Sequence, residues 1–278
     1  MVHQSFTPND GSPPRLALPR TFCPADLGYR TIDDLKASTS KLIKKATKIA
    51  LHHLEEMERP IPRSEMGVFH KAIGDALAEA DPSIQFELLG SFRRGQAFAL
   101  TVEFAIWQSS YSALRDNDEA AKALMAKVKA ALTAAGLMSP DFVFLNGSKK
   151  TMVLTKLPEK VLPGSSYRMM DIRLCKTTSV PYFLLHNTGE ETLMKILRRE
   201  AFHCHLRGLV INGYGMGKRN TAKKASPYAN SNWWTEGTEI PASSEEAIFE
   251  TLGVPYLKPT DRSFKIYEKL LPRHVLSG

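Results

Sequence analysis

The chain has 278 residues, of which 43% are hydrophobic, enough to build a buried interior and to exclude wholesale disorder. Its net charge of +8 indicates a polyanionic partner, either nucleic acid or an acidic membrane surface. Three scattered cysteines are typical of a reducing compartment, and no stretch has the pattern of a signal peptide or a membrane span. We therefore expect a soluble intracellular protein.

The N-terminal part predicts an irregular tail followed by helices. Residues 1–28 are rich in proline, serine and glycine, and a short helix is expected from Asp33. Residues 42–54 place apolar side chains at three- and four-residue spacing, which predicts a longer helix with lysines on its other face. Those lysines either lie on a solvated surface or contact a phosphate backbone. Ser64 is the expected N-cap of the next helix. Its buried side is predicted to carry Phe69, Ile73, Ala76 and Leu77.

The middle of the chain changes to the two-residue alternation of strands. We expect strands at residues 86–88, 100–106, 142–144, 151–157 and 169–174, and one amphipathic helix at residues 118–135. Helices crossed with about five strands predict an α+β sheet domain.

Helical patterns return after Pro181. One helix is expected at residues 192–205, and a second, with a capped start, is expected after Ser244. Residues 213–218 are glycine-rich but lack the preceding strand and the following hydroxyl residue of a phosphate-binding P-loop. A hairpin is the simpler interpretation of that segment.

Two further groups of side chains are candidates for binding a metal ion or a nucleic-acid base. His203, Cys204 and His205 are neighbours on a predicted helix and point in different directions, which favours a surface or partly buried position over a metal site. Trp233 and Trp234 are most simply packing residues, with base stacking as the alternative.

Residues 90–95 (Gly-Ser-Phe-Arg-Arg-Gly) have the chemistry of a phosphate site. Glycine lets backbone N–H groups approach phosphate oxygens, and the Ser91 hydroxyl is a further donor. Arg94 can donate two hydrogen bonds to one phosphate. Taken alone the motif is weak, because ordinary turns have the same composition.

The same six residues match the signature Gly-Ser-(Tyr/Phe)-Arg-Arg-Gly of family X DNA polymerases, the polymerase beta-like nucleotidyltransferases. Other segments resemble that family in the same order along the chain: residues 29–35, 61–65, 170–174, 184–198 and 244–259. The resemblance implies an α+β fold with a helical fingers remnant, a mixed-sheet nucleotidyltransferase palm and a small α+β thumb. We expect the tail at residues 1–28, the fingers remnant at 29–62, the palm at 63–180 and the thumb at 181–278. No helix-hairpin-helix and no lyase domain is recognisable.

The resemblance also implies a role for each matching residue. Asp171 and Glu103 would be the catalytic and metal-binding carboxylates, with Thr101 at a third metal position and Mg²⁺ or Mn²⁺ as the cofactor. Arg173 would support Asp171, and Arg93 would help to line a basic groove. The nucleotide phosphates would be bound by Arg63, Gly90, Ser91 and Arg94. The DNA would be bound by Lys44, Lys45, Lys195 and Arg198.

The chain departs from the family at the metal site. The family has Gly-Asp-x-Asp where this chain has residues 100–103, so Thr101 and Glu103 replace two of three aspartates. Threonine brings no charge, and glutamate is one methylene longer; a misplacement of about 1 Å can cost about a hundredfold in rate. His186 and Asn187 replace an aromatic pair, and Met194 replaces an asparagine near the minor groove.

The predicted function is that of a DNA polymerase-type nucleotidyltransferase. It would add dNTPs to a primer 3′-end under template direction in DNA repair, with impaired activity. The alternative is a catalytically inactive pseudo-polymerase that binds DNA ends or gaps, and a third option acts on RNA ends or without a template. The partners would be DNA and dNTP, with no membrane; the protein would be monomeric and nuclear.

Overall fold

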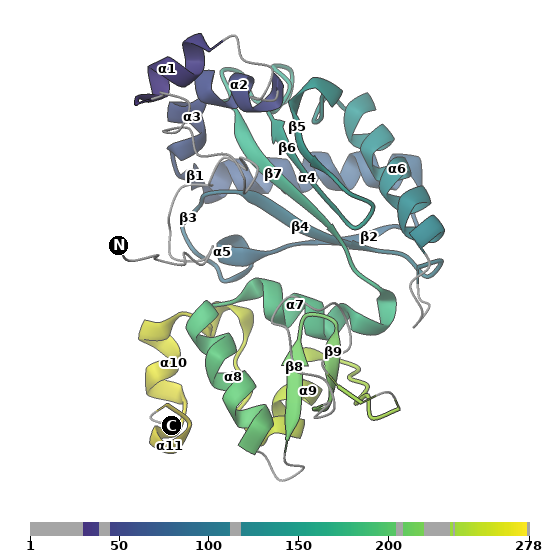
Figure 1. Cartoon of the computed structure of the whole chain (residues 1–278), viewed down its shortest axis with the longest axis vertical. Helices are drawn as coiled ribbons and strands as arrows, with labels where there is room; N and C mark the ends of the chain where they lie inside the picture. The colour runs from purple at the N-terminus through teal and green to yellow at the C-terminus, as the bar shows by residue number, and fades with distance from the viewer. Residues whose placement is uncertain are drawn as a thin grey trace. The chain divides into compact units, whose positions relative to one another are not determined.

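The computed structural model describes residues 30–38, 45–111, 118–203, 208–219, 234–235 and 237–276. The chain divides into two compact units, whose elements are labelled in Figure 1. The first unit comprises residues 1–86, 98–104 and 118–174. The second comprises residues 87–97, 105–117 and 175–278. The predicted tail at residues 1–28 lies outside the described residues, as do Cys204 and His205.

A five-stranded sheet has the order β2-β4-β7-β6-β5, which confirms the predicted α+β sheet. Its strands are β2 (Gln85–Leu88), β4 (Val102–Trp107), β5 (Val143–Asn146), β6 (Lys150–Thr155) and β7 (Arg168–Leu174). β7 is the central strand, and six of its seven residues are buried. It runs antiparallel to β6, with Lys150 opposite Arg173 and Met152 opposite Asp171.

The helices of the first unit follow the predicted apolar patterns. They are α1 (Ile32–Ala37), α2 (Lys45–His52), α3 (Leu54–Glu58), α4 (Arg63–Ala80) and α6 (Asp118–Ala134). A two-residue strand, β1 (Ile61–Pro62), pairs with β3 (Phe98–Ala99). The four residues predicted for the buried side of α4 are all buried.

The predicted N-cap of α4 is wrong. The cap is Pro62, whose extended backbone (φ −60, ψ 148) ends β1 directly before the helix. Proline fixes φ near the value found at this boundary, and no side chain caps the helix there. Ser64 therefore lies inside the first turn.

A buried ion pair fixes the start of β7. Arg168 donates to both carboxylate oxygens of Glu65, at 2.8 and 2.9 Å. It also donates to the carbonyl oxygens of Glu56 and Arg59, at 3.0 and 2.9 Å. One guanidinium thus connects α3, α4 and β7, and it sets the position of the strand on which Asp171 lies.

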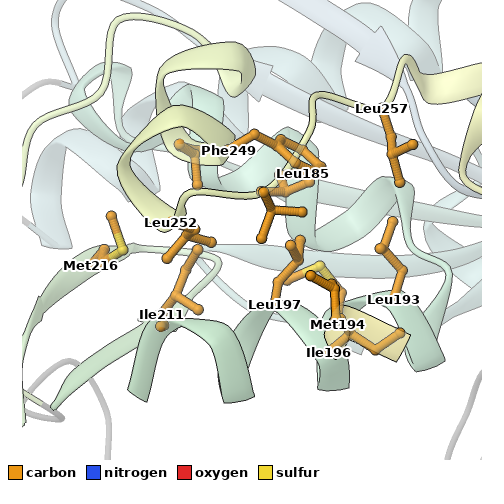
Figure 2. Close-up of a cluster of buried hydrophobic side chains, with 14 of the residues drawn as sticks. Leu185, Leu193, Met194, Ile196, Leu197, Ile211, Met216, Phe249, Leu252 and Leu257 are labelled. Atoms are coloured by element: carbon orange, nitrogen blue, oxygen red, sulfur yellow. The ribbon is translucent and has the colours of Figure 1, made fainter. Parts of the chain in front are cut away.

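The second unit has its own hydrophobic core, shown in Figure 2. Leu193 and Leu197 of α8 meet Phe249 and Leu252 of α9, with Leu185 of α7 between them. The helices are α5 (Gly90–Arg93), α7 (Val180–Thr188), α8 (Glu191–His203), α9 (Glu245–Leu252), α10 (Phe264–Leu270) and α11 (Arg273–Leu276).

The glycine-rich segment is a hairpin, as predicted. β8 (Leu209–Asn212) pairs antiparallel with β9 (Gly215–Lys218). A Cβ atom on Gly217 would lie 2.7 Å from the Trp234 ring, so the glycine is needed for the ring to lie on the hairpin. This supports packing as the role of Trp234, while Trp233 lies outside the described residues. Among the helices that are described, none has the length and hydropathy to cross a membrane.

Candidate functional site

Two acidic side chains of the first unit meet around one arginine. Asp171 and Arg173 are two residues apart on β7, so strand alternation places them on the same face of the sheet. Arg173 donates to Asp171 Oδ2 from Nη2 at 2.6 Å and from Nε at 3.0 Å. Its Nη2 also lies 4.0 Å from Oε1 of Glu103 on the adjacent strand β4. The structure therefore brings together the two carboxylates that the sequence predicted as partners.

A second cation reaches the same carboxylate. Lys150 of β6 lies opposite Arg173, and its Nζ is 3.1 Å from Asp171 Oδ2. The Asp171 side chain is only 4% exposed, and its Oδ1 has no hydrogen-bond partner among the described residues. Lys150 has no local sequence signal, because the register of β6 against β7 is what places it opposite Arg173.

The donor set does not fit a pair of divalent ions. One guanidinium and one ammonium already balance the charges of Asp171 and Glu103, whereas two divalent cations need a surplus of carboxylate charge. Thr101 is the residue immediately before β4, and its side chain carries no charge. In the part of the chain that the structure describes, no three His, Cys, Asp or Glu side chains are grouped so that they could hold a metal ion.

The predicted phosphate segment lies in the second unit. Its first residues form the one-turn helix α5. Gly90 has φ 58, a conformation that side chains disfavour. Arg94 donates from Nη1 to the carbonyl oxygen of Thr188. A Cβ atom on Gly189 would lie 3.1 Å from that same nitrogen, so glycine makes room for this contact.

Arg93 forms a buried clamp instead of lining a groove, which corrects the expectation from sequence. Its side chain is 13% exposed and donates to both oxygens of Glu245, at 3.0 and 2.8 Å, and to Thr188 Oγ1 at 2.8 Å. The fully buried Arg262 donates to Glu245 Oε1 at 2.6 Å. We call Arg93, Glu245 and Arg262 the Glu245 clamp.

The clamp keeps Glu245 ionised. Burial alone would raise the pKa of Glu245, but the hydrogen bonds from Arg93 and the charge of Arg262 together hold that pKa below its usual value. In the sequence, Glu245 indicates only a helix start, because nothing local points to Arg93 or Arg262 as its partners.

The predicted DNA-binding residues differ in their surroundings. Lys195 is 65% exposed on α8 and pairs with Glu191 at 2.9 Å. Arg198 lies one turn later, and its Nη2 is 3.5 Å from His186 Nδ1. Burial lowers the pKa of the Arg198 guanidinium, and the charge of Glu191 offsets only part of this effect. Lys45, the first residue of α2, pairs with Asp141 at 2.8 Å.

Three other sequence positions are located as follows. Lys44 lies outside the described residues. Arg63 is exposed and is the first residue of α4. Met194 is 3% exposed and packs within the core of the second unit.

Comparisons with known proteins give a consistent family. Residues 60–177 match the model of the DNA polymerase beta palm, and residues 183–263 match that of the DNA polymerase beta thumb. Human DNA-directed DNA/RNA polymerase mu is 25% identical over 261 residues, covering 85% of this chain and 48% of the relative. DNA polymerase lambda of Arabidopsis thaliana is 23% identical, covering 85% of this chain and 42% of the relative. The chain thus spans about half the length or less of these relatives.

The fold is shared with a solved polymerase. The crystal structure of Leishmania infantum polymerase beta in a ternary P/T complex superposes with a TM-score of 0.72 and 22% identity. The match covers 86% of this chain and 91% of that chain. It confirms the predicted α+β architecture of palm and thumb. With both domain models matched in order along most of its length, this chain belongs to the polymerase beta-like family X of DNA polymerases.

Proposed function

We propose that the chain binds DNA primer ends or gaps together with an incoming dNTP, and that its template-directed nucleotidyl transfer in DNA repair is impaired. The observation that supports impairment is the neutralised Asp171, which Arg173 and Lys150 contact at 2.6 and 3.1 Å. Thr101 and Glu103, at positions where we infer family aspartates, support it further.

Binding of the nucleotide is assigned to the phosphate segment. Gly90 and Ser91 would present donors to the phosphates, and Arg94, held by the Thr188 carbonyl, would add a positive charge. Arg63 would contribute from the start of α4. DNA would be bound by Lys45, Lys195 and Arg198, as their exposed or half-buried positions on helices allow.

Primer extension tests the transfer step. The assay uses recessed and one-nucleotide-gapped duplexes across a range of Mg²⁺ and Mn²⁺ concentrations, with the Asp171→Asn protein as control. We expect template-directed product at a rate at least about a hundredfold below that of an intact relative, because the carboxylates are displaced and neutralised. Product formation that Asp171→Asn leaves unchanged would contradict the assignment, and absence of product with both ions would reject transfer.

The second candidate is a pseudo-polymerase that binds DNA without chemistry, and the neutral Thr101 favours it. The double substitution Thr101→Asp, Glu103→Asp separates the two candidates. An inactive scaffold with a sound remainder should gain primer extension in this variant. If the variant stays inactive while DNA binding is tight and falls steeply with salt, binding is the function.

We also propose that the protein is monomeric and nuclear, on the basis of the proposed DNA role alone. Light scattering of the purified chain tests the first point. Imaging of a fluorescent fusion in the source cells tests the second, and a signal confined to the cytoplasm would reject it.

A further inference from the structure

Two cations lie beside the Asp171 carboxylate on its face of β7. Arg173 comes from the same strand, and Lys150 comes from the register position directly opposite it on β6. Both reach the same oxygen, Oδ2, while Oδ1 is buried. An added cation therefore meets two positive charges at Oδ2 and a buried atom at Oδ1.

Burial makes this arrangement hard to displace. Because the Asp171 side chain is 4% exposed, its ionised form needs partners that replace water. Arg173 and Lys150 supply three donors to it, at 2.6, 3.0 and 3.1 Å. The Lys150 and Arg173 side chains are themselves 41% and 26% exposed. A divalent ion would have to remove these donors or approach Asp171 against two positive charges a few ångströms away.

We propose that Lys150 and Arg173 are resident cations that take the place of divalent ions at Asp171, so that this site does not hold the pair of ions the family uses. Lys150 is the deciding residue, because it adds the second positive charge from a neighbouring strand. Arg173 alone would leave Asp171 and Glu103 with one net negative charge. The inference deepens the proposed function and rests on it for its biological meaning.

The test measures metal binding to the protein alone, without DNA or nucleotide. The full chain, stripped with a chelator, is titrated with Mn²⁺, and the unbound ion is followed by electron paramagnetic resonance. We expect no saturable binding at this site below millimolar Mn²⁺ in the unmodified protein. Lys150→Met should raise the Mn²⁺ affinity by about tenfold or more, since it removes one repelling charge. Lys150→Arg, the matched control, keeps the charge and should behave as the unmodified protein.

Two outcomes would overturn the proposal. One is saturable submillimolar Mn²⁺ binding by the unmodified protein that either Glu103→Gln or Asp171→Asn removes. The other is equal Mn²⁺ affinity in folded Lys150→Met and Lys150→Arg. If Lys150→Met does not fold, the Mn²⁺ titration of the unmodified protein against Glu103→Gln and Asp171→Asn decides alone. Mn²⁺ binding that neither substitution removes belongs to another site and leaves the proposal standing. Because no substrate is present, failure here is separate from failure in primer extension.

Discussion

At the scale of single residues, Glu245 is the centre of the Glu245 clamp in the second unit. It joins Arg93, which precedes it by 152 residues, to Arg262, which follows it by 17. When the charge of this buried carboxylate is removed, the fully buried Arg262 loses its ion-pair partner, while Arg93 keeps its 3.4 Å ion pair with Glu87.

Glu245→Gln is therefore expected to lower the free energy of unfolding by about 3–5 kcal/mol, the usual cost of breaking a buried ion pair. Urea denaturation followed by circular dichroism measures this loss. The exposed neighbour Glu246 provides the matched control, and Glu246→Gln should change stability by less than about 0.5 kcal/mol. Equal effects of the two substitutions would show that the clamp contributes little.

The clamp also predicts a dependence on pH. The pKa of Glu245 in the folded chain is below the ordinary value of 4.5, so its contribution is complete above that value and is lost as pH falls through the lowered pKa. The difference in unfolding free energy between the unmodified protein and Glu245→Gln should shrink below pH 4.5. Denaturation curves taken from neutral to acidic pH measure it, and a difference that stays constant would contradict the low folded pKa.

At the scale of elements, α9 delivers Glu245 to the clamp and is capped at both ends. Ser244 Oγ accepts from the Ala247 N–H at 3.2 Å, and Gly253 ends the helix with φ 68 and ψ 24. The cap holds the first turn, in which Glu245 is the first residue.

Ser244→Ala should destabilise the chain by about 1 kcal/mol, because a helix donor then lacks its acceptor. The neighbouring Ser243 is exposed and lies outside the cap, so Ser243→Ala is the control and should be close to neutral. Thermal or urea unfolding of the two variants checks this. A larger loss for Ser243→Ala would show that the assigned cap is not the operative one.

Elements with strong periodicity were predicted well, and boundaries set by backbone geometry were not. The alternation around Asp171 predicted β7, and the apolar spacing of Phe69 and Ile73 predicted the buried side of α4. Ser64 was the wrong cap because a proline two residues earlier already began the helix. No local pattern reports a pairing across strands, so the contact between Lys150 and Asp171 required the structure.

At the scale of the whole molecule, the net charge of +8 predicts salt-dependent DNA binding. Lys195 is 65% exposed, so its pairing with Glu191 is weak and its ammonium can turn to a phosphate. Lys195→Ala should reduce the slope of log K against log salt by about 1. Fluorescence anisotropy with gapped DNA at several salt concentrations measures the slope. Lys122→Ala, on α6 of the other unit, is the control and should leave it unchanged.

The family could be predicted from sequence because its signature is local, as residues 90–95 show. The state of the metal site could not be predicted from the sequence, because it depends on which cations the sheet places beside Asp171. Arg93 illustrates the same limit: its place in a phosphate motif indicated an exposed cation, and only its distant partners make it internal.

The discontinuous make-up of the second unit has a consequence for biosynthesis. Residues 87–97 leave the ribosome early, yet they belong to a unit whose core also needs the buried Tyr267, Leu271 and Val275. Arg93 must therefore remain without Glu245 while the intervening chain is translated. We expect this unit to stay open to chaperones until that late segment has emerged, whatever the speed at which the first unit folds.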